Sequence, residues 1–160
     1  MNNAKTRSVI VRFSTLDMER IEKSVFISYR RTNIPWALAI FKDLTQHGYD
    51  AFFDFKGVAS GDFEQVVLGN IPARAHFLVL LTPSALERCG DPSDWLRREI
   101  ETALDTRRNI VPLMLEGFDF DTLKIASQLT GRLAALKCYN GVRILQTILM
   151  KQWNACVVGI

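Results

Sequence analysis

The strand-like segment 76–81, in which His76 is followed by the continuous apolar run Phe77-Leu78-Val79-Leu80-Leu81, is the feature that most constrains the fold of this chain. A strand with one face in water alternates apolar and polar side chains, whereas a run without alternation indicates a strand buried on both faces. Such strands are typical of parallel sheets covered by helices on both sides. The run therefore predicts the central strand of an α/β fold.

Strand-like and helix-like segments alternate along the rest of the chain. The predicted strands are 25–29, 50–55, 76–81, 109–114 and 133–138. The predicted helices are 34–46, 63–71, 95–106 and 142–153, with shorter helical turns at 84–88 and within 116–128. Connections of this length imply parallel strands with helical crossovers. For five such strands we expect a three-layer, flavodoxin-like fold with strand order 2-1-3-4-5.

We divide the chain into three parts. Residues 1–23 are predicted to be an arm or linker, residues 24–155 to form the domain, and residues 156–160 to be a tail. A length of 160 residues fits one domain, which can bury enough surface to fold without a disulfide or a metal. The apolar end of the chain suggests a longer protein, whose other part would be a sensor domain.

Charge and cysteine content argue against several classes of function. The chain has 20 basic and 17 acidic residues, which does not favour nucleic acid as a partner, because that usually requires a concentrated basic patch. Cys89, Cys138 and Cys156 form no C-x-x-C motif, so we expect free thiols and no metal site. No apolar run approaches the ~20 residues that cross a bilayer, and no signal peptide is recognisable. We therefore expect a cytoplasmic protein without membrane contact.

Polar residues follow the predicted strands at the edge where ligands bind in open parallel sheets, outside the carboxyl ends. Arg30 and Arg31 follow the first strand, and Asp54 ends the second. The sequence has no G-x-G-x-x-G, Walker or G-x-S-x-G motif, and its two histidines fit structural or exposed positions. Any phosphate would therefore be bound by these arginines and by backbone amides.

Trp95 and Glu99 lie four residues apart and share one face of a predicted helix. The indole can stack on a base or on nicotinamide, and a partly desolvated carboxylate stabilises a nearby cationic transition state. The alternative interpretation is a helix with a buried tryptophan and a solvated glutamate. The W-x-x-x-E pattern alone does not distinguish the two.

The chain from about Ser24 to Trp153 resembles a TIR (Toll/interleukin-1 receptor) domain, most closely those of bacterial proteins and of the animal axon-degeneration NADase. Five blocks in the family's order carry the resemblance: Val25-Phe26-Ile27-Ser28-Tyr29-Arg30-Arg31, Ala51-Phe52-Phe53-Asp54 with Gly61 and Phe63 downstream, Phe77-Leu78-Val79-Leu80-Leu81-Thr82-Pro83-Ser84-Ala85-Leu86, Asp94-Trp95-Leu96-Arg97-Arg98-Glu99-Ile100 and Asn109-Ile110-Val111-Pro112.

The resemblance implies roles for particular residues. Glu99 matches the catalytic glutamate of the enzymatic members, which cleave nicotinamide from NAD⁺. Residues 55–63 match the family's BB loop, where Ala59 stands at the position of an acidic residue in the animal enzyme, so contacts with NAD⁺ there are expected to differ. The residues assigned to substrate binding are Tyr29, Arg30, Arg31, Asp54, Ala59, Phe63 and Trp95.

The function implied by the resemblance is an NAD⁺ hydrolase that forms ADP-ribose or a cyclic ADP-ribose. NAD⁺ would be the substrate, with no cofactor, and activity would depend on self-association of TIR domains, in immune or cell-death signalling or defence. Two alternatives stay open. One is a scaffold that acts only through homotypic TIR contacts, although such domains usually lack the glutamate that follows Trp95 by four residues. The other is a hydrolase resembling the nucleoside 2-deoxyribosyltransferases.

Overall fold

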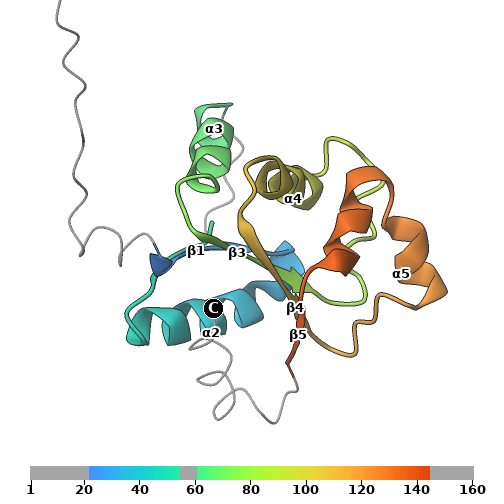
Figure 1. Ribbon diagram of the computed structural model, residues 1–160, viewed down its shortest axis with the longest axis horizontal. Helices are drawn as coiled ribbons and strands as arrows, with labels where there is room; N and C mark the ends of the chain where they lie inside the picture. The colour runs from blue at the N-terminus through green and yellow to red at the C-terminus, as the bar shows by residue number, and fades with distance from the viewer. Residues whose placement is uncertain (1–21, 55–60, 145–160) are drawn as a thin grey trace, which may run out of the picture.

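The computed structural model describes residues 22–54 and 61–144, of which residues 61–64 are described by their backbone alone, and they contain a five-stranded parallel sheet (Figure 1). Its strands are β1 (Ser24–Ser28), β2 (Asp50–Phe52), β3 (His76–Leu81), β4 (Asn109–Met114) and β5 (Val142–Arg143). The helices are α2 (Ile34–Gln46), α3 (Gly61–Asn70), α4 (Trp95–Asp105) and α5 (Leu123–Gln128), with 3₁₀ helices η1 (Arg31–Asn33) and η2 (Gly131–Cys138). The order β2-β1-β3-β4-β5, with parallel neighbours throughout, confirms the prediction.

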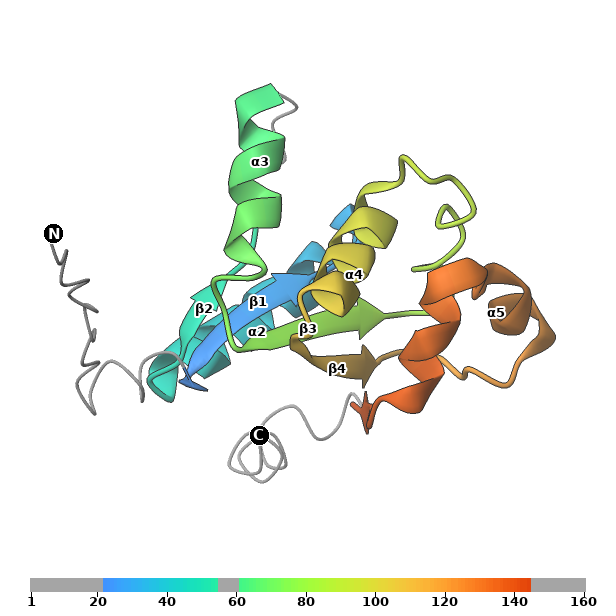
Figure 2. The same cartoon turned by 45° about the horizontal axis from the view of Figure 1, so that its top comes forward.

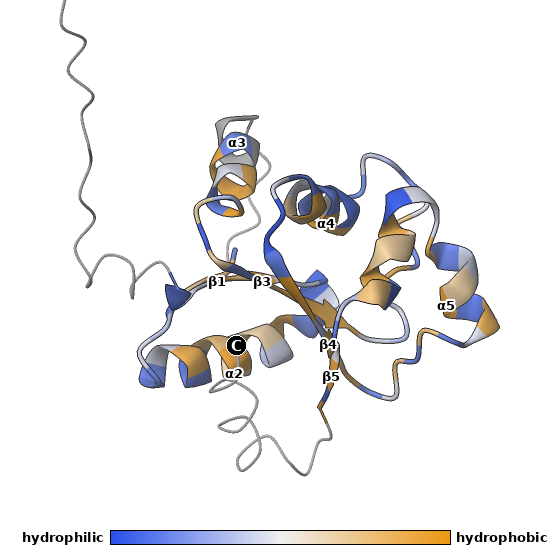
Figure 3. Ribbon diagram, viewed as in Figure 1, coloured by the Kyte–Doolittle hydropathy of each residue, from blue (hydrophilic) through white to orange (hydrophobic). Residues whose placement is uncertain are grey.

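Helices cover both faces of the sheet, which explains the continuous apolar run in β3. Figure 2 shows α3 and α4 on one face and α2 on the other. In β3, Phe77 and Val79 belong to the core beneath α3 and α4, whereas Leu78 and Leu80 belong to the core above α2. Successive side chains of a strand point to opposite faces, so both sets must be apolar. Figure 3 shows the resulting hydrophobic colouring of the central strands.

Local sequence signals set the ends of the two helices nearest the candidate site. Helix α2 has a proline in its first turn and is followed by Gly48, whose φ of 81° favours glycine. Helix α4 begins after Asp94, whose side chain accepts a hydrogen bond from the backbone N–H of Arg97. This cap satisfies one of the amides that a helix leaves unpaired, and it fixes where the first turn starts.

The fifth strand was predicted wrongly at 133–138. These residues lie in η2, where Leu133 and Leu136 are both buried. A separation of three residues places them on one side of a 3₁₀ helix, whereas a strand would point them to opposite faces. The fifth strand is instead Val142–Arg143, which pairs with the end of β4, so the helix predicted to begin at Val142 is wrong at its start.

Other boundaries differ by small amounts, and several predictions fall outside the structure. The second strand ends at Phe52, and residues 84–88 form turns rather than a regular helix. Residues 1–21, 55–60 and 145–160 lie outside the described residues, including most of the predicted arm, the rest of the last helix and the tail. In the part of the chain that is described, no helix combines the length and hydrophobicity needed to span a membrane.

Candidate active site

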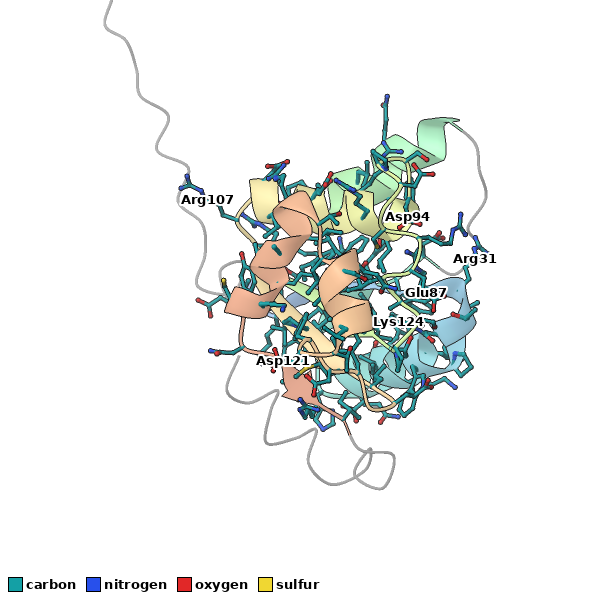
Figure 4. The ribbon with its side chains drawn as sticks, turned by 90° about the vertical axis from the view of Figure 1, so that its right-hand side faces the viewer. Arg31, Glu87, Asp94, Arg107, Asp121 and Lys124 are labelled. Atoms are coloured by element: carbon teal, nitrogen blue, oxygen red, sulfur yellow. The ribbon has the colours of Figure 1, made fainter. Side chains whose placement is uncertain are left out.

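The candidate site lies at the carboxyl ends of β1 and β2, where helix α4 packs against the sheet. Ser28 ends β1 and is followed by Tyr29 and Arg30, while Asp54 lies two residues beyond β2. The connection after β3 leads back to α4, which brings its first two turns over the end of β1. Figure 4 shows Arg31 and Asp94 on one side of the molecule, with Arg107 on the opposite side.

Glu99 lies in the second turn of α4, and its carboxyl group is buried. Only 4% of the residue is exposed, and the Ser28 hydroxyl donates a hydrogen bond of 2.5 Å to Oε2. The Trp95 side chain also hydrogen-bonds to the carboxyl group, while its ring is partly buried against the core. The structure therefore contradicts the alternative of a buried tryptophan beside a solvated glutamate: the glutamate is the more buried of the two.

The protonation of Glu99 follows from this burial. Loss of water raises the pKa of the carboxyl group to about 8, because the charged form is the one that burial destabilises. Hydrogen bonds from Ser28 and Trp95 and the charge of Arg30 lower the pKa, and the charge of Asp54 raises it. Glu99 is therefore mostly protonated near pH 7, and a positive charge placed beside it would favour its ionised form.

Arg30 joins the end of β1 to the start of α4. Its Nη1 and Nη2 donate to the two carboxylate oxygens of Asp94 at 2.6 and 2.8 Å, and its Nε donates to the carbonyl of Ala85 at 2.6 Å. The same Nη2 lies 3.3 Å from the Cys89 sulfur. The guanidinium group therefore holds the loop after β3 and the helix cap together. The substrate contact assigned to Arg30 stays a prediction.

The environments of Asp94 and Cys89 have opposite effects on their charged forms. Burial alone would raise the pKa of Asp94, but the hydrogen bonds from Arg30 and from the Arg97 amide, together with the Arg30 charge, outweigh burial and lower it. Burial raises the pKa of the Cys89 thiol to about 12, so this thiol stays protonated. Asp94 is thus a permanent anion, and Cys89 is not a nucleophile in this conformation.

Tyr29 connects the exits of the first two strands. Its hydroxyl donates to the backbone carbonyl of Asp54 at 2.5 Å, and its ring lies 5.9 Å from the ring of Phe53. Burial and then the charge of Asp54 raise the pKa of Tyr29 to about 12, so it acts as a neutral donor. This contact places Asp54 at the same edge as Glu99.

The remaining predicted site residues are placed less completely. Arg31 is exposed in η1, beside the candidate site. Phe63 lies in α3, but its side chain is not described, and Ala59 lies outside the described residues. The structure thus brings together Tyr29, Arg30, Asp54, Trp95 and Glu99, and the binding roles of all these residues stay predictions.

Sequence reasoning missed Ser28 and a second buried polar pair at this edge. Asn33 donates through Nδ2 to the Thr82 hydroxyl at 3.1 Å, and both residues are buried. The available signal for Ser28 was its position, as the one polar residue that closes an otherwise apolar strand segment, Val25-Phe26-Ile27. Its partner could not be read from the pattern, because Glu99 follows 71 residues later.

The arrangement offers one buried acid that can change its charge. When protonated, Glu99 can donate a hydrogen bond, and when ionised it can stabilise a positive charge in a site of low polarity. Among residues 22–54 and 61–144, no group of three or more histidine, cysteine, aspartate or glutamate side chains is placed to hold a metal ion. The geometry of Glu99 suits a carboxyl group that meets a cationic or hydroxyl-rich ligand.

Comparison with known sequences identifies a family over most of the chain. The family described as "TIR domain" matches residues 25–141. The NAD(+) hydrolase tir-1 of Caenorhabditis elegans is 34% identical over 123 residues, which are 74% of this chain and 12% of that protein. The NAD(+) hydrolases sarm1 of Drosophila melanogaster and SARM1 of Danio rerio are 34% and 37% identical over 74% and 56% of this chain. The chain thus spans only a small part of the length of these relatives.

Solved structures show the same fold at low sequence identity. The TIR domain of the Toll-related receptor TRR-2 from Hydra magnipapillata has a TM-score of 0.60 and 12% identity, covering 84% of this chain and 95% of the other. The TIR domains of the activated Roq1 resistosome, which directly recognises the pathogen effector XopQ, have a TM-score of 0.60 and 17% identity, covering 85% and 97%. These similarities support the fold.

Proposed function

Because this chain belongs to the TIR domain family, we propose that it is an NAD⁺ hydrolase, which releases nicotinamide from NAD⁺. The observation that carries the proposal is the burial of the Glu99 carboxyl group at the carboxyl edge of the sheet, where Ser28 and Trp95 hold it and burial raises its pKa to about 8. Acids with strongly shifted pKa values are typical of functional sites. In open parallel sheets, ligands bind at the edge formed by the carboxyl ends of the strands. Similarity to three NAD(+) hydrolases supports the choice of substrate.

The chemistry needs only one carboxyl group. The nicotinamide of NAD⁺ is a cationic pyridinium and leaves as a neutral molecule, so no general acid is required to protonate it. As the N-glycosidic bond breaks, positive charge moves to the ribose, which becomes oxocarbenium-like. Glu99 in its ionised form stabilises this charge and accepts hydrogen bonds from ribose hydroxyls. Water then attacks C1′ and gives up a proton, forming ADP-ribose, or a nucleophile within the same molecule closes a cyclic product.

The raised pKa of Glu99 fits a site that accepts a cation. The neutral acid avoids the free energy of burying an uncompensated charge while the site is empty of substrate. Binding of the pyridinium provides the missing positive charge, which lowers the pKa and releases the proton to solvent. Ionised Glu99 is thus formed where and when the cationic reactant is present.

Activity is proposed to depend on self-association of TIR domains, in cytoplasmic immune or cell-death signalling. The Roq1 TIR domains, which share this fold, occur in an assembled resistosome. If a site is completed by a neighbouring copy, its rate grows faster than linearly with protein concentration, because the fraction of assembled chains also grows. We expect this behaviour for nicotinamide release by the purified chain, and strict proportionality to concentration would contradict it.

The test of the proposed function is product analysis by mass spectrometry after incubation of concentrated protein with NAD⁺. Wild type and two variants are compared at matched assembly state, measured by light scattering. Glu99→Gln removes the candidate acid, and Glu101→Gln is the matched control, because Glu101 lies on the same helix but pairs with Arg97 at 2.9 Å. We expect wild type and Glu101→Gln to release nicotinamide, and Glu99→Gln to lose at least about 100-fold.

Two results would contradict the proposal. Equal rates for wild type and Glu99→Gln would show that Glu99 is not catalytic. No release by wild type in the assembled state would favour a scaffold, or, if a panel of nucleosides is cleaved instead of NAD⁺, a nucleoside hydrolase.

A further inference from the structure

Ser28 is a buried polar residue in direct contact with the candidate acid. It is the last residue of β1, only 1% of it is exposed, and its hydroxyl donates to Oε2 of Glu99 at 2.5 Å. We propose that Ser28 is a positioning residue for the reaction, whose hydroxyl anchors the Glu99 carboxyl group in the orientation that meets the ribose. The role in catalysis rests on the proposed function, whereas the anchoring itself does not.

The anchor is well placed because it stands on an inner strand of the sheet. β1 lies between β2 and β3, and Ser28 itself is in register with Val79 of β3. A serine side chain has a single rotatable bond before its hydroxyl, so a donor at this point has little freedom. The carboxyl group of Glu99 stands on a longer side chain, and the hydrogen bond to a rigid strand limits its rotation.

Burial makes this contact difficult to replace. Buried polar groups need a partner, because leaving a hydroxyl or a carboxyl group unpaired destabilises the protein. Ser28 and Glu99 satisfy each other at a place where both residues are almost fully enclosed. An alanine at 28 would leave Oε2 without this donor, and the carboxyl group would be free to turn toward other partners.

The Ser28 hydroxyl can donate to Glu99 in both charge states of the carboxyl group. It can donate to Oε2 when the acid proton is on the other oxygen, and the same hydrogen bond becomes stronger when the group is ionised. Ser28 therefore opposes the effect of burial on the pKa of Glu99. The other groups that act on this carboxyl group are the Trp95 side chain from α4, Asp54 from the end of β2 and Arg30 from the end of β1.

The test uses three substitutions of Ser28 and one control in the same strand. Ser28→Ala removes the hydroxyl, Ser28→Cys replaces it by a weak donor of similar shape, and Ser28→Thr keeps it. Ser24→Ala is the control, because Ser24 is a buried serine at the other end of β1, where its Oγ accepts a hydrogen bond from the backbone N–H of Ala75. The control thus removes a buried hydroxyl from the same strand, far from Glu99.

The readout is the titration midpoint of the Glu99 carboxyl carbon, measured by NMR on protein with ¹³C-labelled glutamate. We expect Ser28→Ala and Ser28→Cys to raise the midpoint by about one to two pH units, since a hydrogen bond to an ionised group is lost. Ser28→Thr and Ser24→Ala should keep the midpoint of the wild type. An unchanged midpoint in Ser28→Cys, or in Ser28→Ala if it folds, would overturn the anchoring role.

A second readout separates this proposal from the proposed function. The pH profile of kcat/KM for nicotinamide release, which reports the free enzyme, should move upward in Ser28→Ala and Ser28→Cys by the same amount as the NMR midpoint, and Ser28→Thr should restore the wild-type profile. A lower rate with an unmoved profile would overturn the catalytic part and leave Ser28 as a packing residue. If wild type releases no nicotinamide, the proposed function fails, and the NMR titration still decides whether Ser28 anchors Glu99.

Discussion

Two buried carboxyl groups lie within five residues of each other at the start of α4, one at the helix cap and one in the second turn. Asp94 is 5% exposed and Glu99 is 4% exposed, so little of either residue reaches solvent, although more protein packs around the Glu99 carboxyl group. At the cap, Arg30 makes a bidentate contact with Asp94, and the pKa of Asp94 is lowered. In the second turn, the hydrogen bonds to Glu99 come from uncharged Ser28 and Trp95 side chains, and burial raises its pKa to about 8.

Burial destabilises the charged form of both acids, and the comparison teaches that the partner decides whether this effect is outweighed. A cation in direct contact makes Asp94 a permanent ion that holds two segments together. Glu99 has neutral donors in direct contact, so its charge depends on what binds beside it. Pairs of acids whose environments move their pKa values apart are typical of sites with divided roles. In this protein the division is between an acid that holds the structure and one that is available for chemistry.

The largest expected effect is that a substitution of Glu99 changes activity, whereas a substitution of Asp94 changes stability. Glu99→Gln should lower the rate of nicotinamide release by about 10²–10⁴-fold and leave the fold intact, because an amide keeps the shape but cannot carry the negative charge. Asp94→Asn should instead reduce the free energy of unfolding. Circular dichroism and rate measurements on both variants check this. A Glu99→Gln variant that unfolds, or that keeps its activity, would remove the distinction.

The next largest effect is expected when Arg30, the cation that contacts the helix cap Asp94, is replaced. Arg30→Met leaves Asp94 as an uncompensated buried charge, and such losses reduce the free energy of unfolding by about 3–5 kcal/mol. Urea unfolding measures the change. Arg88→Met is the matched control, because the Arg88 side chain is 81% exposed and lies 3.9 Å from the same carboxylate. The Arg30 side chain is only 14% exposed. Equal effects of the two variants would show that burial of the Arg30–Asp94 pair does not contribute to the free energy of unfolding.

The two acids should also give opposite dependences of stability on pH. The pKa of folded Glu99 is raised from 4.5 to about 8, so the stability it contributes is present below 4.5 and is lost as pH rises toward 8. Relative to Glu99→Gln, wild type should lose about 1.4 kcal/mol per pH unit between these values. The lowered pKa of Asp94 acts on the acid side, where stability is lost as pH falls. Urea unfolding of both proteins between pH 5 and 7.5 checks the sign, and parallel curves would contradict it.

The smallest expected effect is at an exposed ion pair in the same part of the chain. Glu87 and Lys124, which are labelled close together in Figure 4, approach to 2.5 Å, but their side chains are 45% and 58% exposed. Exposed pairs contribute little, because water screens the charges and both side chains lose freedom. Lys124→Met should change the free energy of unfolding by no more than about 0.5 kcal/mol. A loss as large as that of Arg30→Met would mean that distance alone sets the strength of these pairs.

The fold was largely predictable because the spacing of apolar residues along the chain indicates where its strands and helices form. The apolar run at 76–81 identified β3 with its observed bounds, and the strand at 109–114 and the helix at 34–46 were also placed as observed. The failure at Leu133–Cys138 has a physical cause: two leucines three residues apart, with alanines between them, fit a short buried strand and a 3₁₀ helix equally well by composition. The choice depends on what packs against them, which a local pattern does not contain.

The site was predictable in its location but not in its contacts. The positions of Arg30, Asp54 and Trp95 after strand ends placed them at one edge, as the structure shows. The sequence did not reveal that Glu99 is more buried than Trp95, or that Ser28 holds it, because both depend on the meeting of β1 with α4 across 71 residues. The contact of Arg30 with Asp94, 64 residues away, has the same long-range origin.

The most direct test of the account is an NMR titration of the Glu99 and Asp94 carboxyl carbons, with and without an NAD⁺ analogue whose ribose oxygen is replaced by carbon, so that its bond to nicotinamide cannot be hydrolysed. The account predicts a Glu99 midpoint near 8 in the free protein, a clear decrease when the cationic analogue binds, and an Asp94 midpoint below its usual range in both states. A Glu99 midpoint near 4.5, or one that bound analogue does not move, would contradict the claim that this acid responds to a cationic substrate.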